Sequence, residues 1–152
     1  EYSGEATTEE GLNILADYLS DLGIPESDYT LVNGSGLSPD LEIKPSVITT
    51  VLLDIYQDPT LRHEFLASLA VNGQEGTLKW RLEEEPTYSK LRGKTGSING
   101  VYCLGGYIRT NEGKVYAFAF FVNDIQRSVR NVRNAQDWFA EIIMKYPQIV
   151  EP

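Results

Sequence analysis

A run of apolar residues in the last third of the chain restricts the possible folds more than any other feature. Residues 115–122 read Val-Tyr-Ala-Phe-Ala-Phe-Phe-Val, and such β-branched and aromatic residues favour a strand, predicted over 114–122. A strand that is apolar on both of its faces needs cover on both faces. The run therefore predicts a sheet packed between two layers.

The residues before this run predict two more strands of the same sheet. Residues 101–110 are strongly β-like, and the polar loop Asn111-Glu112-Gly113 joins them to the apolar run. A short polar loop that ends in glycine between two apolar runs is typical of a hairpin. A weaker, polar pattern predicts a first strand over 90–97, followed by a turn at Asn99-Gly100. We therefore expect a three-stranded antiparallel meander.

The first predicted helix covers residues 7–22. Its leucines recur at spacings of three and four, which places them on one apolar stripe. Thr7 and Glu10 fit a capping box at its start, and Gly23 is placed to end it. The residues of the stripe are Leu12, Leu15, Leu19 and Leu22.

Further helices are predicted over 45–57, 60–70 and 126–146, with one or two helical turns within 77–84. The stripe expected to be buried on the last helix is formed by Val132, Ala135, Phe139, Ile142, Ile143 and Tyr146. Residues 29–32 are predicted to form a short strand. Because helices come first, then the meander, then a packing helix, the chain is predicted to be α+β.

Length and charge exclude several classes of protein. The 152 residues predict a single domain, residues 1–152, that is large enough to bury a core. A formal net charge of −9 disfavours nucleic acid as a partner, because an acidic surface repels phosphates. No apolar run approaches the roughly 18 residues of a membrane-spanning helix.

Nothing in the sequence predicts a metal or an organic cofactor. His63 is the single histidine and lies within a predicted amphipathic helix, so we interpret it as a surface residue. Cys103 is the single cysteine, which excludes an internal disulfide and predicts a buried, inert thiol. The acidic run 83–85 lacks the pattern of a calcium loop. Gly34-Ser35-Gly36 lacks the spacing of a phosphate-binding loop.

One tripeptide, Lys94-Thr95-Gly96, followed by Ser97, has the composition of a ligand-binding strand. Lysine supplies a positive charge and can pass protons, threonine donates a hydrogen bond, and glycine lets another backbone approach closely. Together they suit a substrate carboxylate at the end of an extended peptide. An ordinary strand end with a solvated lysine explains the same three residues, and the tripeptide alone favours that interpretation.

Four ordered blocks reverse this preference. They are residues 33–38 (Asn-Gly-Ser-Gly-Leu-Ser), 73–78 (Gly-Gln-Glu-Gly-Thr-Leu) with Arg81, 94–101 (Lys-Thr-Gly-Ser-Ile-Asn-Gly-Val) and 104–107 (Leu-Gly-Gly-Tyr). From about Thr7 to Asp124 the chain resembles the C-terminal part of class C, type-4 low-molecular-mass penicillin-binding proteins, which are D-alanyl-D-alanine carboxypeptidases/endopeptidases. One departure is Asn33, where the family usually has aspartate, so a contact of that loop is in question.

The resemblance implies part of a penicillin-binding/β-lactamase-like transpeptidase fold and a role for each residue of the tripeptide. Lys94 is expected to steady the terminal carboxylate of the substrate and to support proton transfer, and Thr95 to hydrogen-bond that carboxylate. Gly96 is expected to let a stem peptide or a β-lactam lie against the strand. Ser97 is expected to offer its backbone N–H to the oxyanion hole. The resemblance implies no metal or organic cofactor.

The family's other two motifs lie outside this chain. No Ser-x-x-Lys occurs in it, and Ser97-Ile98-Asn99 follows the Lys-Thr-Gly strand directly, whereas the family's Ser-x-Asn precedes that strand by over a hundred residues. We therefore expect a C-terminal fragment, inactive alone, of a serine peptidase that acts on peptidoglycan stem peptides and is inhibited by β-lactams. Its sheet is expected to expose an edge or an apolar face where the family adds N-terminal strands.

Other interpretations stay open at this stage. A non-catalytic peptidoglycan- or penicillin-recognising module would keep the fold without the nucleophile, and a generic α+β interaction domain would make the resemblance coincidental. Because the substrate of the family is in the cell wall, the protein is expected in the periplasm or outside the cell. The chain itself shows no export signal and no transmembrane segment.

Overall fold

The computed structural model describes residues 7–125 and 128–150. Its helices are α1 (Thr8–Asp21), α2 (Pro45–Gln57), α3 (Arg62–Ser68) and α4 (Val129–Lys145), with short 3-10 turns η1 (Glu26–Asp28), η2 (Gly76–Leu78) and η3 (Pro147–Ile149). Its strands are β1 (Tyr29–Thr30), β2 (Glu42–Ile43), β3 (Ala70–Val71), β4 (Leu91–Ile98), β5 (Val101–Arg109) and β6 (Val115–Val122).

The predicted meander is present as β4, β5 and β6, with antiparallel pairing throughout. The prediction of three strands was incomplete, because β3 adds a fourth and the order is β3-β4-β5-β6. The sequence pattern had placed β3 in a helix over 60–70. That helix ends at Ser68, where Leu69 adopts an extended backbone (φ −87°, ψ 138°), and Ala70 and Val71 then pair with Gly93 and Arg92.

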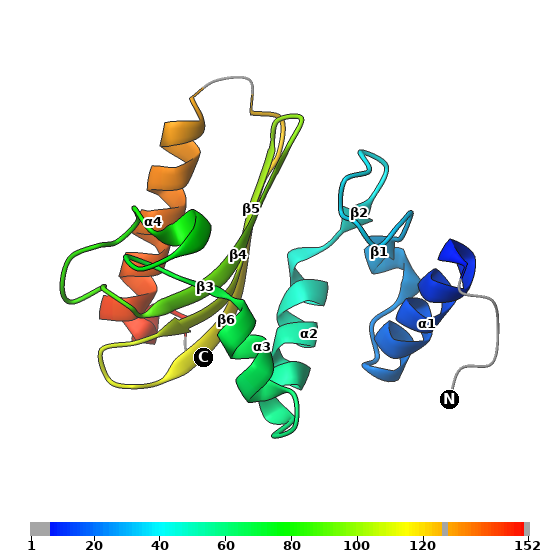
Figure 1. Cartoon of the computed structure of the whole chain (residues 1–152), viewed down its shortest axis with the longest axis horizontal. Coiled ribbons are helices and arrows are strands. Elements are labelled where there is room, and N and C mark those ends of the chain that lie inside the picture. Colours follow the sequence, from blue (N-terminus) through cyan, green and yellow to red (C-terminus); the bar gives the residue numbers. More distant parts are fainter. Residues whose placement is uncertain (1–6, 126–127, 151–152) are drawn as a thin grey trace.

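Both faces of the sheet are covered, as the apolar run over 115–122 predicts. Phe118 of β6 belongs to the core cluster that includes Ala140 and Met144 of α4. Ala117, the next residue along β6, packs instead with the cluster of Leu52 in α2. The alternating sides of β6 therefore face two different helical layers. Figure 1 shows α4 on one side of the strands and α2 and α3 on the other.

The N-terminal region forms a second, smaller cluster away from the sheet (Figure 1). The capping box of Thr7 and Glu10 is confirmed, and Leu19 packs with Ile24 and with Val47 of α2. Leu15 is an exception to the predicted apolar stripe, because 42% of it is exposed. The strand predicted over residues 29–32 is confirmed in part as β1, which pairs with β2 in a separate two-stranded sheet.

Within 77–84, where one or two helical turns were predicted, a single 3-10 turn, η2, forms. Leu82, with a φ of 50°, lies outside the right-handed helical region. The buried stripe predicted for the last helix was wrong in part. Ala135 of α4 and Tyr146, which directly follows α4, are exposed, while Gln136 and Met144 of α4 are buried. The buried stripe is therefore shifted by about one position from the predicted one. The prediction counted only apolar residues as buried, and so it missed the polar Gln136. The first two residues of the predicted helix lie outside the described residues.

Candidate active site

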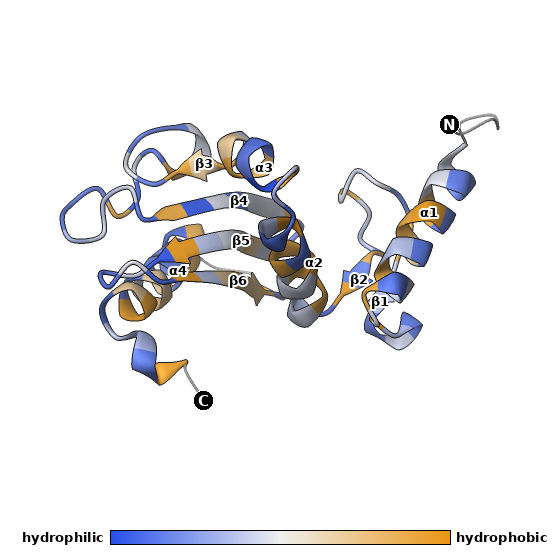
Figure 2. Cartoon of the chain, turned by 90° about the horizontal axis from the view of Figure 1, so that it is seen from below, coloured by the Kyte–Doolittle hydropathy of each residue, from blue (hydrophilic) through white to orange (hydrophobic). Residues whose placement is uncertain are grey.

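The two halves of β4 have different environments. Leu91 and Gly93 in the first half are buried, whereas Lys94, Gly96 and Ser97 in the second half are exposed. On its outer side β4 is paired only by β3, which ends its pairing at Gly93. Figure 2 shows β3 beside the start of β4. The Lys-Thr-Gly tripeptide therefore lies on an open strand edge of the described structure.

The backbone register shows which groups of β4 point to this edge. Leu91 uses both its N–H and its carbonyl on the outer side, toward Asn72 (2.7 and 3.1 Å). The carbonyl of Lys90 faces the other way and accepts from the N–H of Arg109 (2.8 Å). Because these directions alternate along a strand and the register of β4 with β5 is continuous, the N–H groups of Thr95 and Ser97 face the open edge.

A positive charge and a hydroxyl lie at the same edge. The Lys94 ammonium donates a hydrogen bond to the Thr95 carbonyl (2.7 Å), so its charge folds back onto the strand's own backbone. The Thr95 hydroxyl is hydrogen-bonded to the Thr77 hydroxyl (2.9 Å). An ammonium, a hydroxyl and outward N–H groups form a set of donors that suits an extended chain ending in a carboxylate. This charge is local and opposes the net −9 of the chain.

The glycine of the tripeptide, Gly96, is the cross-strand partner of Cys103 in β5. A Cβ atom on Gly96 would be 3.5 Å from the Cys103 Cβ, which is an ordinary contact. The surface above Gly96 is therefore low and open to another backbone. Cys103 is half-buried and not fully buried as predicted, and its burial raises the pKa of the thiol. A raised pKa lowers the fraction of reactive thiolate, in line with the inert thiol that we expected.

A loop between β3 and β4 supplies a residue of the site that sequence reasoning missed. Thr77, in η2, is eighteen positions from Thr95 in the chain, yet their hydroxyls are in contact. The sequence block 73–78 was recognised only as part of the resemblance, and no local pattern indicates that Thr77 meets Thr95. Only the return of the loop to the sheet edge brings the two together.

Asn72 fixes both ends of this loop. It is fully buried, and its side-chain amide donates to the carbonyls of Leu82 (2.8 Å) and Thr87 (3.0 Å). Its side-chain oxygen accepts the N–H of Leu91, the first residue of β4. One side chain thus joins the end of β3, the loop and the start of β4, which makes the position of Thr77 dependent on the sheet.

An ion pair fixes the same loop to α4. Arg81 donates from Nε to Asp137 (2.8 Å) and from its terminal nitrogen to the carbonyl of Arg133 (3.2 Å). Arg81 is buried, and burial raises the pKa of the Asp137 carboxyl although the guanidinium acts in the opposite direction. The pair therefore anchors the loop to α4.

The other candidate residues contribute no chemistry at this edge. His63 is exposed on α3, and residues 83–85 are exposed, as predicted. Among the residues that the structure describes, no group of three or more His, Cys, Asp or Glu is placed to hold a metal ion. No helix within the described ranges is long and apolar enough to cross a membrane.

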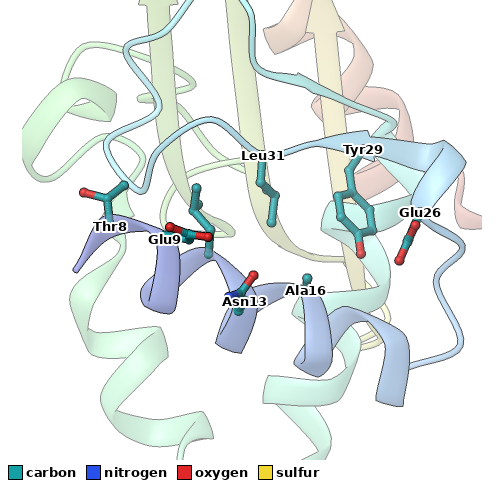
Figure 3. Close-up of a pocket in the computed structure, with 8 residues that line it drawn as sticks. Thr8, Glu9, Asn13, Ala16, Glu26, Tyr29 and Leu31 are labelled. Atoms are coloured by element: carbon teal, nitrogen blue, oxygen red, sulfur yellow. The ribbon is translucent and has the colours of Figure 1, made fainter. Parts of the chain in front are cut away.

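A cavity of about 560 Å³ lies between α1 and β1, on a different part of the molecule. Figure 3 shows its lining, which includes Glu9 and Asn13 of α1 and Tyr29 and Leu31 from the segment of β1. None of the residues of the tripeptide lines it. We therefore place the candidate site at the open edge of β4 and not in this cavity.

The fold and this strand edge define the class of protein, and comparison with known families agrees. Residues 1–143 match the model of the D-Ala-D-Ala carboxypeptidase 3 (S13) family. The chain belongs to this family. In the loop where the family usually has aspartate, the Asn33 side-chain oxygen accepts from the N–H (3.0 Å) and the hydroxyl (2.7 Å) of Ser35. An oxygen acceptor is therefore still present at this position.

Individual proteins that are similar to this chain are carboxypeptidases too. The chain is 38% identical over 108 residues to penicillin-sensitive carboxypeptidase A of Dictyostelium discoideum, which covers 69% of this chain and 20% of that protein. It is 30% identical over 124 residues to D-alanyl-D-alanine carboxypeptidase DacB of Haemophilus influenzae, covering 80% of this chain and 26% of the relative. The chain thus spans about a fifth to a quarter of these relatives.

A solved structure confirms the fold. The crystal structure of penicillin binding protein 4 (dacB) from Haemophilus influenzae superimposes with a TM-score of 0.78 at 26% identity, over 93% of this chain and 33% of that one. The same protein, complexed with a β-lactam, gives a TM-score of 0.79. The predicted α+β arrangement as part of a penicillin-binding fold is therefore confirmed.

Proposed function

We propose that this chain supplies the Lys-Thr-Gly strand of a serine D-Ala-D-Ala carboxypeptidase/endopeptidase that cleaves peptidoglycan stem peptides through an acyl-enzyme. The observation that carries this proposal is the open edge of β4, where Lys94, Thr95 and the N–H of Ser97 lie beside one another. Membership of the S13 family supports it, as do the carboxypeptidases among the relatives.

The reaction assigns a separate task to each group at this edge. A serine hydroxyl outside this chain attacks the carbonyl carbon between the two D-alanines, the C–N bond breaks, and the terminal D-alanine leaves with the added proton on its amine. Water then hydrolyses the acyl ester and returns a proton to the serine. Lys94 and Thr95 bind the terminal carboxylate during acylation. The N–H of Ser97 stabilises the oxyanion, and such a donor is worth about 10²–10³ in rate.

Lys94 has to reach the substrate carboxylate in this role, and its ammonium has three N–H donors with which to do so. Its ammonium now donates to the Thr95 carbonyl, at the edge where an extended stem peptide pairs. A substrate backbone would compete for that carbonyl, and a carboxylate is the stronger acceptor for an ammonium. We propose that substrate moves the ammonium from the strand to the carboxylate. The same edge would take a β-lactam, and the proposed place of action is the periplasm or the outside of the cell, where peptidoglycan lies.

The test uses the whole protein that contains this chain and a fluorescent penicillin as the probe. Wild-type protein is expected to form a covalent adduct, and Lys94→Ala is expected to slow both acylation and carboxypeptidase turnover by 100-fold or more. Lys145→Ala is the matched control, because it removes an equal charge from an exposed ion pair at the end of α4. The isolated 152-residue chain is expected to form no adduct.

Each result bears on a different part of the proposal. Unchanged rates in Lys94→Ala would show that the open edge is not the site. Stoichiometric labelling of the isolated chain would show that its nucleophile lies within these residues. Reversible penicillin binding by the whole protein, with no covalent adduct, would favour the non-catalytic recognition module instead.

A further inference from the structure

We propose that Thr77 is a positioning residue that sets the direction of the Thr95 hydroxyl toward the substrate carboxylate. This inference rests on the proposed function, because it concerns the same carboxylate. Its basis is the contact between two hydroxyls from different elements, Thr77 in η2 and Thr95 in β4, whose oxygens are 2.9 Å apart.

The chemistry of two hydroxyls decides the direction of this hydrogen bond when substrate is present. Each threonine hydroxyl has one proton to donate and lone pairs that accept. A carboxylate only accepts, so Thr95 must give its own proton to the substrate. Thr77 must then donate to the Thr95 oxygen. The resulting chain runs from the Thr77 hydroxyl through Thr95 to the carboxylate, and such a chain polarises each donor along it.

The loop around Thr77 is built to keep this residue in place. Leu78, the next residue, is 1% exposed and belongs to the core between the sheet and α4. Gly76, the preceding residue, has a φ of 57°, and a Cβ there would lie 3.0 Å from the Ala70 Cβ of β3. Thr77 is therefore an exposed hydroxyl between a core anchor and a tight backbone contact.

The same loop is fixed at points that are independent of the hydroxyl pair. Asn72 ties it to the start of β4, and Arg81 ties it to Asp137 of α4. Removal of the Thr77 hydroxyl leaves all of these contacts intact. A variant at this position can therefore change the hydrogen bond without unfolding the loop, which makes the proposal accessible to experiment.

The experiment measures carboxypeptidase kinetics of the whole protein on two matched peptides. One ends in D-Ala-D-Ala with its free carboxylate, and the other carries an amide in place of that carboxylate. Thr77→Val, nearly isosteric, is expected to lower kcat/KM for the carboxylate peptide by up to about tenfold, because it removes the neutral hydrogen bond that directs the Thr95 hydroxyl toward the carboxylate. On the amide peptide, kcat/KM of Thr77→Val is expected to stay within about twofold of the wild-type value.

Four further variants complete the test. Thr77→Ser keeps a hydroxyl and is expected to stay within about twofold of wild type on both peptides. Thr30→Val, an exposed threonine of β1 in the other sheet, is the matched control and is expected to have no effect. Thr95→Val and the double variant Thr77→Val/Thr95→Val are expected to have equal rates, because Thr77 acts through Thr95.

The outcomes separate this inference from the proposed function. Equal losses on both peptides, or additive losses in the double variant, would show that Thr77 has a structural role only. Wild-type rates in Thr77→Val would show that it has no role. A wild-type protein that cleaves neither peptide and forms no penicillin adduct would overturn the proposed function itself, whatever the Thr77 variants do.

Discussion

The two halves of β4 form one continuous strand, but they differ in burial and in whether another strand pairs with their outer edge. In the first half, Leu91 is 1% exposed and Gly93 is buried beneath a close approach of β5. In the second half, Lys94 and Ser97 are exposed, and the outer edge has no strand beside it among the described residues. The strand is therefore held at one end and free for a ligand at the other.

This difference shows how a rigid site is built on an exposed edge. An unpaired strand edge readily binds another extended chain, but it must be held in register to place donors accurately. In this protein the register is set by the buried half, through β3, Asn72 and a glycine contact with β5. Substitutions in the buried half should therefore affect stability, and those in the exposed half should affect activity.

The largest expected effect comes from Gly106 of β5, which faces the buried half. A Cβ atom on Gly106 would lie 2.1 Å from the Arg92 carbonyl oxygen and 2.7 Å from the Gly93 Cα, where neither backbone can move away. Gly106→Ala is expected to lower the free energy of unfolding by about 4 kcal/mol or more, by overpacking two strands. Urea denaturation followed by circular dichroism measures it.

Gly96→Ala is the matched comparison in the exposed half. Its Cβ would meet only the Cys103 Cβ at an ordinary 3.5 Å. We expect a change in unfolding free energy within about 1 kcal/mol, since alanine in a strand also loses less entropy than glycine. Similar destabilisation by both substitutions would contradict the division of β4 into two halves.

The next largest effect is expected for Asn72, which joins the loop to the buried half. Asn72→Ala leaves the buried N–H of Leu91 and two carbonyls without their partner. Since each unsatisfied buried group costs about 1–3 kcal/mol, we expect a loss of about 3 kcal/mol. Gln74→Ala, which removes an exposed hydrogen bond to Ser89 (2.8 Å), is expected to cost about 0.5 kcal/mol or less. Equal urea midpoints of unfolding for the two variants would show that the hydrogen bonds of Asn72 do not stabilise the loop and the start of β4.

The smallest effect concerns pH and involves Tyr107, which pairs with Arg92 in the buried half. Its hydroxyl donates to the Leu52 carbonyl (2.6 Å), and burial, with a smaller contribution from Tyr56, raises its pKa to about 12. In the unfolded chain this pKa is about 10. The folded state therefore resists ionisation, and stability that is complete below pH 10 is lost as the pH rises toward 12.

Two pKa units correspond to at most about 2.7 kcal/mol. Unfolding free energies measured at intervals from pH 9 to pH 12 are expected to fall less steeply in Tyr107→Phe than in wild type. Tyr18, whose pKa is also raised to about 12 by burial and by its hydrogen bond to Asp54, contributes to the slope that remains in the variant. Parallel curves of unfolding free energy against pH for the two proteins would show that Tyr107 ionises as readily in the folded state as in the unfolded chain.

Local signals made much of the fold predictable. Thr7, Glu10 and Gly23 mark the ends of α1, and Pro45 opens α2, because caps and helix-starting prolines act on their own neighbours. The apolar run of β6 correctly predicted two covering layers. β3 escaped prediction, because two residues are too few to show an alternating pattern and its pairing with β4 depends on residues more than twenty positions away.

The site was predictable in kind but not in its full membership. By itself, the sequence determined the four helices, the three long strands and the Lys94-Thr95-Gly96-Ser97 segment, since these depend on residues close together in the chain. It also determined the family, through four short blocks that occur in order. Only the tertiary structure decided which edge of β4 is open and that Thr77 meets Thr95. These facts depend on how a distant loop returns to the sheet, and buried contacts such as those of Asn72 leave no local pattern that predicts that return.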